Sequence, residues 1–221
     1  MKHAAAQYSD MPNSKTTAEK ILDSAEALFA DSGYDAVSVR AITKRAGVEL
    51  ALVNYHFGSK QELFYRVVER RAAEINAERV RLLNEQSESH SVESIIDAFT
   101  RPFLEKSLLG GGWKSYARLI AQVSNSPRWT KLVMSTQFDP IAQAFVDQMR
   151  SALPGSKLED IYWGFHFLLG AVTFTFAETG RVDELSDGLC RSGDLVIIHA
   201  KMVPFLAAGF REICLAQGAK Q

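Results

Sequence analysis

The sequence predicts an all-α protein in which a small N-terminal helical module precedes a larger helical bundle. Apolar residues recur with the 3.6-residue helical period, strand-like alternation is almost absent, and helix-capping residues precede the periodic segments. The apolar fraction of 47% is that of a globular chain, and 221 residues are enough for one or two domains. We expect a mobile tail over 1–14, a first domain over 15–60, a connecting helix over 61–85 and a second domain over 86–221.

The first domain is expected to hold three short helices. Thr16-x-x-Glu19 has the spacing of a capping box, in which a hydroxyl and a carboxylate each satisfy a backbone amide at the helix start. Gly33 stands where a left-handed residue would end this first helix. Ser38 is a typical N-cap residue for a second helix, and a third helix is predicted over 49–57.

The rest of the chain is predicted to be helical as well. A second capping box, Ser59-x-x-Glu62, opens a long helix that continues into the eighties. The polar stretch 84–91 is the best candidate for a domain boundary, and an acidic loop is expected around 183–187. The further predicted helices are 91–109, 113–124, 128–152, 158–179 and 194–216, and Pro140 is expected to kink or split the third of them.

The charge balance excludes a histone-like polybasic binder. Lys and Arg number 25 against 26 Asp and Glu, which gives a net charge of −1. However, residues 38–71 hold seven basic and three acidic side chains, so a basic region is hidden in the neutral total. A local basic region of this kind remains compatible with nucleic-acid binding.

The cellular location is predicted from what the sequence lacks. Cys190 and Cys214 do not have the number or spacing of a disulfide framework or a zinc site, and we expect two buried free thiols in a reducing compartment. No apolar signal segment stands near the N-terminus. The longest run without a charged residue, 161–177, is shorter than the roughly 20 residues that a membrane span needs. We therefore expect a cytoplasmic protein without membrane association.

Three short helices with a glycine-containing turn between the last two fit a helix-turn-helix. Ala51 and Tyr55 would then point away from the domain, with Leu52 and Asn54 beside them, as a helix in the DNA major groove requires. Lys60 begins the next helix, where a phosphate would be held. A helical hairpin with a solvated charged face is the alternative. The core that the crossing helices would share consists of Val39, Ile42, Val48, Val53 and Phe57.

Residues 18–64 resemble the DNA-binding domain of the tetracycline-repressor (TetR) family. The positions that carry the resemblance are Ala25, Leu28, Phe29, Gly33, Ser38, Val39, Ile42, Gly47, Val48, His56, Phe57, Lys60 and Leu63. The resemblance implies a regulator that binds double-stranded DNA sequence-specifically. It implies base contacts by Arg40, Leu50, Ala51, Leu52 and Asn54, and phosphate contacts by Ser38, Tyr55, His56 and Lys60.

The chain departs from the TetR pattern in the third helix. Family members often have Tyr where Asn54 stands, and small polar residues where Leu50 and Leu52 stand. Asn54 therefore either reads a base or holds the backbone, and the operator sequence does not carry over from the family.

The second domain carries no catalytic motif that we can identify. The glycines at 110–112 lack the Lys-Ser/Thr of a phosphate-binding loop, and His166 and His199 are interpreted as core histidines. We assign no catalytic, metal-binding or cofactor-binding residue and expect no enzymatic activity. A helical enzyme that uses an aromatic pocket is the remote alternative, which turnover of a bound ligand would revive.

The helices at 158–179 and 194–216 are apolar around their circumference, and such helices must be covered on every side. We expect them to form a four-helix homodimer interface, as the TetR resemblance also implies. A two-fold dimer reads a palindromic or pseudopalindromic operator.

The remaining aromatic residues of 86–221 either fill the core or line a ligand pocket. The TetR resemblance implies a small hydrophobic effector that releases a repressor from DNA. The segments VNYHFGSK, FHFLLGA and MVPFLAAGFR resemble a subgroup that controls fatty-acid degradation, which implies a fatty acid or an acyl thioester. Arg118 is either a carboxylate partner or a member of a surface ion pair. A regulator without a small-molecule ligand is the alternative. The expected pocket residues are Phe103, Trp113, Tyr116, Arg118, Phe138, Phe145, Trp163 and Phe167.

Overall fold

The computed structural model describes residues 15–85 and 91–215 and contains helices but no strand within these ranges. The predicted all-α class is confirmed. The tail expected over 1–14 and the central part of the boundary expected over 84–91 lie outside the described residues.

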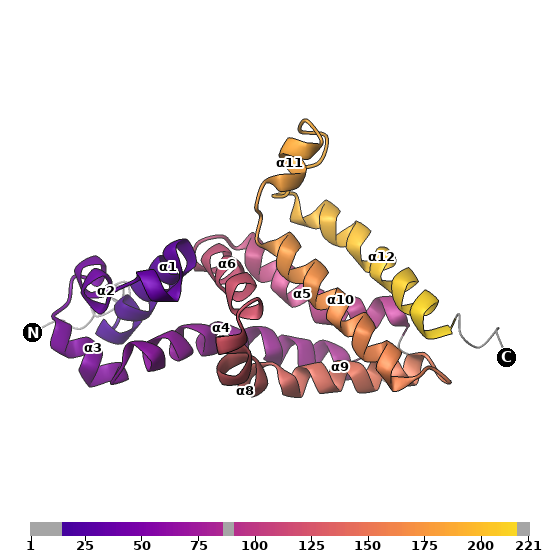
Figure 1. Cartoon of the computed structure of the whole chain (residues 1–221), viewed down its shortest axis with the longest axis horizontal. Helices are drawn as coiled ribbons and strands as arrows, with labels where there is room; N and C mark the ends of the chain where they lie inside the picture. Colours follow the sequence, from indigo (N-terminus) through magenta and orange to yellow (C-terminus); the bar gives the residue numbers. More distant parts are fainter. Residues whose placement is uncertain (1–14, 86–90, 216–221) are drawn as a thin grey trace, which may run out of the picture.

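The first helices form a head at one end of the molecule. Helices α1 (Thr17–Ala36), α2 (Val39–Ala46) and α3 (Leu50–Phe57) pack together there, and α4 (Lys60–Glu85) runs from this head into the bundle (Figure 1). The predicted shared core is present: Ile42 and Val53 are buried, and Val39, Val48 and Phe57 pack against them half-buried.

Two capping predictions are confirmed and one is only half met. Thr16 and Glu19 form the reciprocal capping box of α1. The Ser38 hydroxyl accepts a hydrogen bond from the Ala41 amide at 3.1 Å and caps α2. The Ser59 hydroxyl likewise accepts from the Glu62 amide at 3.1 Å, but the Glu62 carboxylate pairs with Arg66 and does not complete a box.

The prediction that Gly33 ends the first helix as a left-handed cap is wrong. Gly33 has φ 77° and ψ 165°, which is not left-handed helical geometry, and the helix resumes for a further turn to Ala36. Glycine is suited to this kink because the positive φ disfavours side chains. The additional turn carries Tyr34, whose ring packs on Phe29 and Phe64.

The bundle follows α4. Most of its helices begin and end close to the predicted positions. The helix predicted over 128–152 is split just before Pro140, as expected, because a turn at Phe138 interrupts it and Pro140 lies in the first turn of α9. A π-helical turn that the sequence did not predict breaks it a second time, closer to its start. The acidic loop contains a short helix. The elements are α5 (Val92–Leu108), α6 (Gly112–Ser124), α7 (Pro127–Trp129), the π-helical turn η1 (Thr130–Met134), α8 (Ser135–Gln137), α9 (Asp139–Ala152), α10 (Leu158–Phe176), α11 (Arg181–Leu185) and α12 (Leu195–Leu215).

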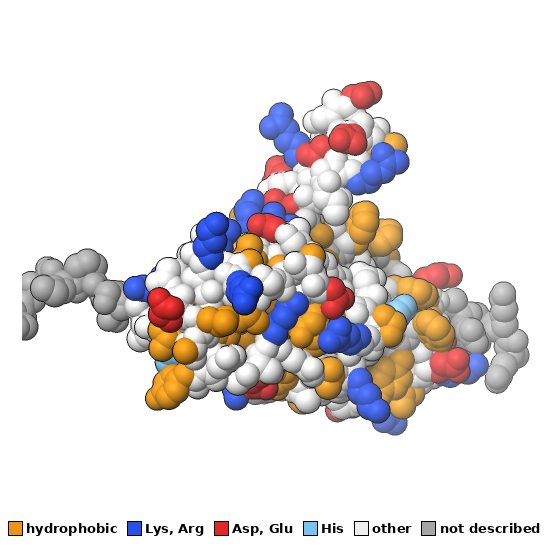
Figure 2. Space-filling model, turned by 60° about the vertical axis from the view of Figure 1, so that its left-hand side comes forward, with side chains coloured by type: hydrophobic (Ala, Val, Ile, Leu, Met, Phe, Trp, Pro, Cys, Tyr) orange, Lys and Arg blue, Asp and Glu red, His pale blue; other side chains and the backbone are white. Residues whose placement is uncertain are grey.

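Helices α10 and α12 lie side by side at the outside of the bundle, and the α11 segment projects from it (Figure 1). In Figure 2, this projection carries acidic and basic side chains, whereas apolar side chains reach the surface below it. No helix within residues 15–85 and 91–215 is both long and apolar enough to cross a lipid bilayer.

Two predictions of burial are wrong. Cys214 is buried, but Cys190 is exposed on the segment that follows α11. His199 is half-buried, with Nε2 2.9 Å from the Thr100 hydroxyl, whereas His166 is exposed beside Trp163. His166 is exposed because no segment within residues 15–85 and 91–215 covers the α10 face that carries it.

Candidate DNA-binding and ligand-binding sites

Helix α3 presents an exposed face away from the head. Val53 anchors the helix in the core, while Tyr55 is 82% exposed and Leu50 is 42% exposed. Ala51, Asn54 and His56 are exposed as well. Leu52, which the TetR resemblance places at a base edge, is half-buried and packs against the core. The surface available to DNA is therefore narrower than the sequence predicts.

The exposed cations of the head lie mainly on α2. Arg40, Lys44 and Arg45 are exposed and form no ion pair among residues 15–85 and 91–215. The basic residues farther along the 38–71 segment differ, because carboxylates pair with Arg66, Arg70 and Arg71. The free positive charge of the head is thus concentrated beside α3.

Lys60 lies at the first turn of α4, at the positive end of the helix dipole, which favours an anion. Its Nζ is 4.2 Å from the centroid of the Tyr34 ring, and burial against this surface lowers the pKa of Lys60. The Lys60 ammonium is therefore held over a half-buried residue that packs against the core of the head.

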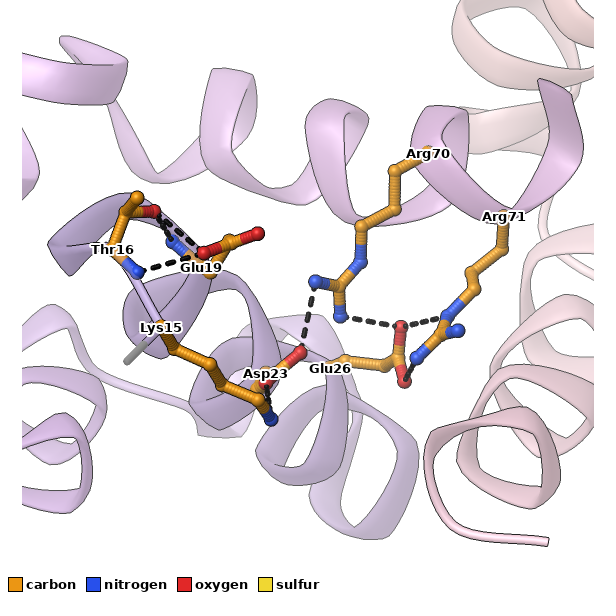
Figure 3. Close-up of polar contacts among 7 residues, drawn as sticks. All are labelled: Lys15, Thr16, Glu19, Asp23, Glu26, Arg70 and Arg71. Carbon is orange, nitrogen blue, oxygen red and sulfur yellow. Dashed lines mark hydrogen bonds and ion pairs between the residues drawn. The ribbon is translucent and has the colours of Figure 1, made fainter. Parts of the chain in front are cut away.

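A group of four charged residues, the junction cluster, joins the head to the bundle (Figure 3). It consists of Asp23, Glu26, Arg70 and Arg71. Glu26 is 2% exposed and lies 2.9 Å from Arg70 Nη2 and 3.0 Å from Arg71 Nε. Arg70 also pairs with Asp23 at 2.9 Å. The cluster connects α1 to α4 through a buried carboxylate.

Helix α6 closes the junction cluster from the bundle side. The Arg71 guanidinium lies 4.4 Å from the centroid of the Trp113 ring, so Trp113 packs at the junction and does not line the cavity described below. A Cβ at Gly112 would overlap Arg71 and Glu26. A larger residue at position 112 would therefore displace the ends of the Arg71 and Glu26 side chains.

A second set of contacts joins the head to the segment around η1. The Trp129 ring lies 4.7 Å from the Tyr34 ring and 4.3 Å from the Phe64 ring. Nearby, Arg118 pairs with Asp31 on α1 at 3.1 Å. Arg118 thus forms the surface ion pair that was one of its two predicted roles, and it does not line the cavity.

A cavity of about 80 Å³ lies inside the bundle. Of the eight predicted pocket residues, Phe103, Tyr116 and Phe138 line it. Phe145 is fully buried in the aromatic core, where it packs against Phe99, Phe165 and Phe210. Trp163 and Phe167 are about half exposed on the outer face of α10. The full lining is Ile75, Arg79, Phe99, Phe103, Tyr116, Ala117, Ile120, Ser124, Met134, Phe138, Asp139, Ile141, Ala142, Phe165, Leu169, Val172, Thr173 and Phe176.

Among the polar lining residues that the sequence did not reveal, Arg79 is the buried charge. It is 5% exposed, and its Nε donates to the Phe99 carbonyl at 2.8 Å. Within α4, Arg79 stands among charged neighbours and resembles a solvated helix face. Its position four residues after the buried Ile75 was the available signal, because such residues share a helix face.

The outer face of α10 and α12 is apolar. Gly164 lets the helices approach, because a Cβ there would overlap the Phe210 ring, whereas a Cβ at Gly170 would meet no atom within 4 Å. Within residues 15–85 and 91–215, the close approach of α10 and α12 therefore involves Gly164 and not Gly170. The large apolar residues exposed on this face are Tyr162, Trp163, Phe167, Phe174, Val196, Ile197 and Phe205.

The fold and the exposed α3 define a helix-turn-helix DNA-binding regulator with a separate helical bundle. The family model described as bacterial regulatory proteins, tetR family, matches residues 21–67, and the model described as tetracyclin repressor-like, C-terminal domain, matches residues 97–209. The chain belongs to the TetR family of transcriptional regulators.

The similar proteins that have a named function are distant in sequence. The chain is 25% identical over 141 residues to IcaR of Staphylococcus aureus, the negative transcriptional regulator of the biofilm operon icaADBC, over 64% of this chain and 72% of IcaR. The structure of SmeT, repressor of a Stenotrophomonas maltophilia multidrug efflux pump, aligns with a TM-score of 0.62 at 20% identity, covering 88% of this chain and 90% of SmeT. The fatty acid degradation regulator FadR of Bacillus halodurans aligns with a TM-score of 0.58 at 15% identity. This alignment covers 86% of this chain and 98% of the FadR chain. The structural similarities show the shared fold.

Proposed function

We propose that this protein is a homodimeric repressor that binds a palindromic operator and is released by a small hydrophobic effector in the bundle cavity. The observation that carries this proposal is that one segment, 129–138, both packs on the head and lines the cavity. Family membership supports DNA binding, and IcaR, the relative described above, is a negative regulator.

In the proposed complex, α3 enters the major groove. Arg40, Leu50, Ala51 and Asn54 are exposed on α2 and α3 and are the candidates for base contacts. Leu52 contributes to packing, because it is half-buried. The candidates for phosphate contacts are Ser38, Tyr55, His56 and Lys60.

The proposed dimer forms through α10 and α12. Phe174 and Phe205 are 65% and 75% exposed, and a soluble chain rarely leaves so many large apolar side chains on one face uncovered. A second copy related by a two-fold axis would cover the same face on both protomers and present two α3 helices to successive major grooves.

Release is proposed to follow the contacts from the cavity to the head. Met134 and Phe138 line the cavity, and Trp129 lies one turn before Met134 and packs on Tyr34. Tyr34 in turn supports the Lys60 ammonium. An effector that binds more tightly to one conformation of segment 129–138 than to another would shift the population of dimers. The favoured dimers would hold their two α3 helices at a spacing that does not fit DNA.

The size of the cavity limits the effector. Its volume of about 80 Å³ is well below the roughly 300 Å³ or more of a typical drug-sized ligand pocket. A compact molecule therefore fits better than the long acyl chain that the family resemblance suggests, for which the walls would have to open. The same small volume favours, as a second candidate, a repressor that has no small-molecule ligand.

The test starts with selection of DNA from a random pool by the purified full chain, followed by sedimentation of the protein alone and on the selected site. We expect an inverted repeat bound by a dimer. A stable monomer at micromolar concentration, or DNA binding without sequence preference, would contradict the proposal. Native mass spectrometry of the purified protein separates the two candidates, because only the ligand-responsive one predicts a retained small molecule whose removal or addition alters operator affinity.

A further inference from the structure

The Arg79 guanidinium is a buried positive charge with neutral partners. Its Nε donates to the Phe99 carbonyl and its Nη1 donates to Asn76 Oδ1 at 3.1 Å, while the Phe99 ring centroid lies 3.9 Å away. No carboxylate pairs with it in the part of the chain that the structure describes. Burial lowers the pKa of Arg79 to about 10, so the side chain remains protonated at neutral pH. Buried charges in proteins are ordinarily paired.

Two hydroxyl groups in the same cavity lining also lack a partner among the described residues. The Tyr116 hydroxyl and the Ser124 hydroxyl are buried and form no hydrogen bond with residues 15–85 or 91–215. Burial raises the pKa of Tyr116, so its hydroxyl keeps its proton and can donate. Two donors and a cation among otherwise mostly apolar walls suit an acceptor that carries negative charge.

The same lining limits the ligand to one anionic group. Asp139 also lines the cavity, but it is exposed and forms no ion pair with Arg79 in the described residues. Its negative charge disfavours a second anionic group, as in a phosphate ester or a dicarboxylate. A neutral ligand would satisfy the hydroxyls but leave the charge of Arg79 without an anion.

We propose that the cavity binds a compact apolar monocarboxylic acid, whose carboxylate is held by Arg79 with the Tyr116 and Ser124 hydroxyls. This inference rests on the proposed function, since it names the chemical class of the effector. The carboxylate has two acceptor oxygens for the guanidinium and the hydroxyls, and the aliphatic or aromatic body packs against the apolar lining. The acid-binding arginine is thus Arg79 and not Arg118, which already pairs with Asp31.

The test compares acids with their uncharged amides. Hexanoate, benzoate and phenylacetate are each titrated into the purified chain of 221 residues by calorimetry at pH 7.5, beside the matching primary amide. We expect at least one acid to bind about tenfold or more tightly than its amide, because the charged hydrogen bonds are lost in the amide. If no acid binds at millimolar concentration, or if the amides bind as well as the acids, the proposal is wrong.

Two arginine variants form a matched pair. Arg79→Gln should abolish the preference for acids, whereas Arg118→Gln should retain it, and circular dichroism checks the fold of both. Arg79→Lys keeps the charge and should keep a weaker preference for acids over amides. This variant still tests the proposal if Arg79→Gln does not fold. An acid preference that survives in Arg79→Gln would overturn the assignment.

Variants that remove the Tyr116 and Ser124 hydroxyls provide an independent test of the proposal. Tyr116→Phe and Ser124→Ala should each weaken acid binding by about threefold to tenfold without destabilising the ligand-free protein, since neither hydroxyl has a partner to lose. Unchanged acid affinity in both variants would contradict their role. Operator binding is measured separately: acids that bind without changing operator affinity would refute the proposed release mechanism and leave the ligand class standing.

Discussion

The buried carboxylate of Glu26 accepts two hydrogen bonds from the Arg71 guanidinium, at 3.0 and 3.2 Å. This pair crosses from the head to the long helix that enters the bundle, and Trp113 packs on its other side. The orientation of the head therefore depends on a charge pair that is largely shielded from water.

Glu26→Gln tests this pair. The amide keeps the size of the side chain but removes the charge that offsets Arg70 and Arg71, so we expect a loss of about 2 kcal/mol in the free energy of unfolding. The estimate is below that for a fully buried pair, because the arginines are 24% and 20% exposed. Urea denaturation measures the loss. Glu62→Gln, in an exposed pair with Arg66, is the control and should cost less than about 0.5 kcal/mol.

Gly164→Ala should destabilise the protein, because its Cβ would overlap the Phe210 ring and force α10 and α12 apart. A loss of about 1–3 kcal/mol is expected from such overpacking. Gly170→Ala on the same helix meets no atom within 4 Å and should be neutral, or stabilise by up to about 1 kcal/mol. Thermal unfolding at equal protein concentration compares the two, and equal effects would contradict the close approach.

Lys60→Ala should weaken binding to all DNA sequences alike. Loss of one phosphate contact should reduce the slope of log affinity against log salt by about 1. Fluorescence anisotropy on specific and random duplexes over a range of salt concentrations gives both quantities. Arg150→Ala, on α9 in the bundle, is the control, and a salt slope that stays at the wild-type value in Lys60→Ala would argue against a phosphate contact.

Arg40→Ala should instead relax the preference at one position of the operator. An arginine that reads a guanine contributes about 1–3 kcal/mol of discrimination. Binding to a set of operators with single substitutions locates this position. Equal losses on operator and random DNA would show that Arg40 contacts only phosphate.

Phe167→Glu should shift the protein toward monomer, because it places a charge on the apolar outer face of α10. Sedimentation velocity at micromolar concentration measures the shift. Leu109→Glu, at a site 71% exposed between α5 and α6, controls for the added charge and should remain dimeric. Dissociation of both variants to the same extent would point to an interface elsewhere.

The head was the most predictable part of the molecule, because its capping residues and apolar spacing are local signals. Ser38, Ile42 and Val53 take the positions that these signals predict. Helical periodicity also located most helices of the bundle. It could not place Trp163 and Phe167, since a fully apolar helix does not reveal which side is covered by the same chain.

The charged residues of the interior were not predictable in the same way. Glu26 and Arg79 look like surface residues of their helices, and only the approach of distant segments buries them. The break in the helix predicted over 128–152 has a similar cause. Trp129 is held on the head while Met134 packs at the cavity, and the chain between them accommodates a π-helical turn.

The π-helical turn at Thr130–Met134 has a geometric consequence. A π-turn holds about one residue more than an α-turn, and each residue of an α-helix advances the direction of its side chain by about 100°. If this turn tightened to α-helical register, Trp129 and Phe138 would rotate relative to each other about the helix axis. The surplus residue of the π-helical turn thus sets the angle between the aromatic contact on the DNA-binding head and the wall of the cavity.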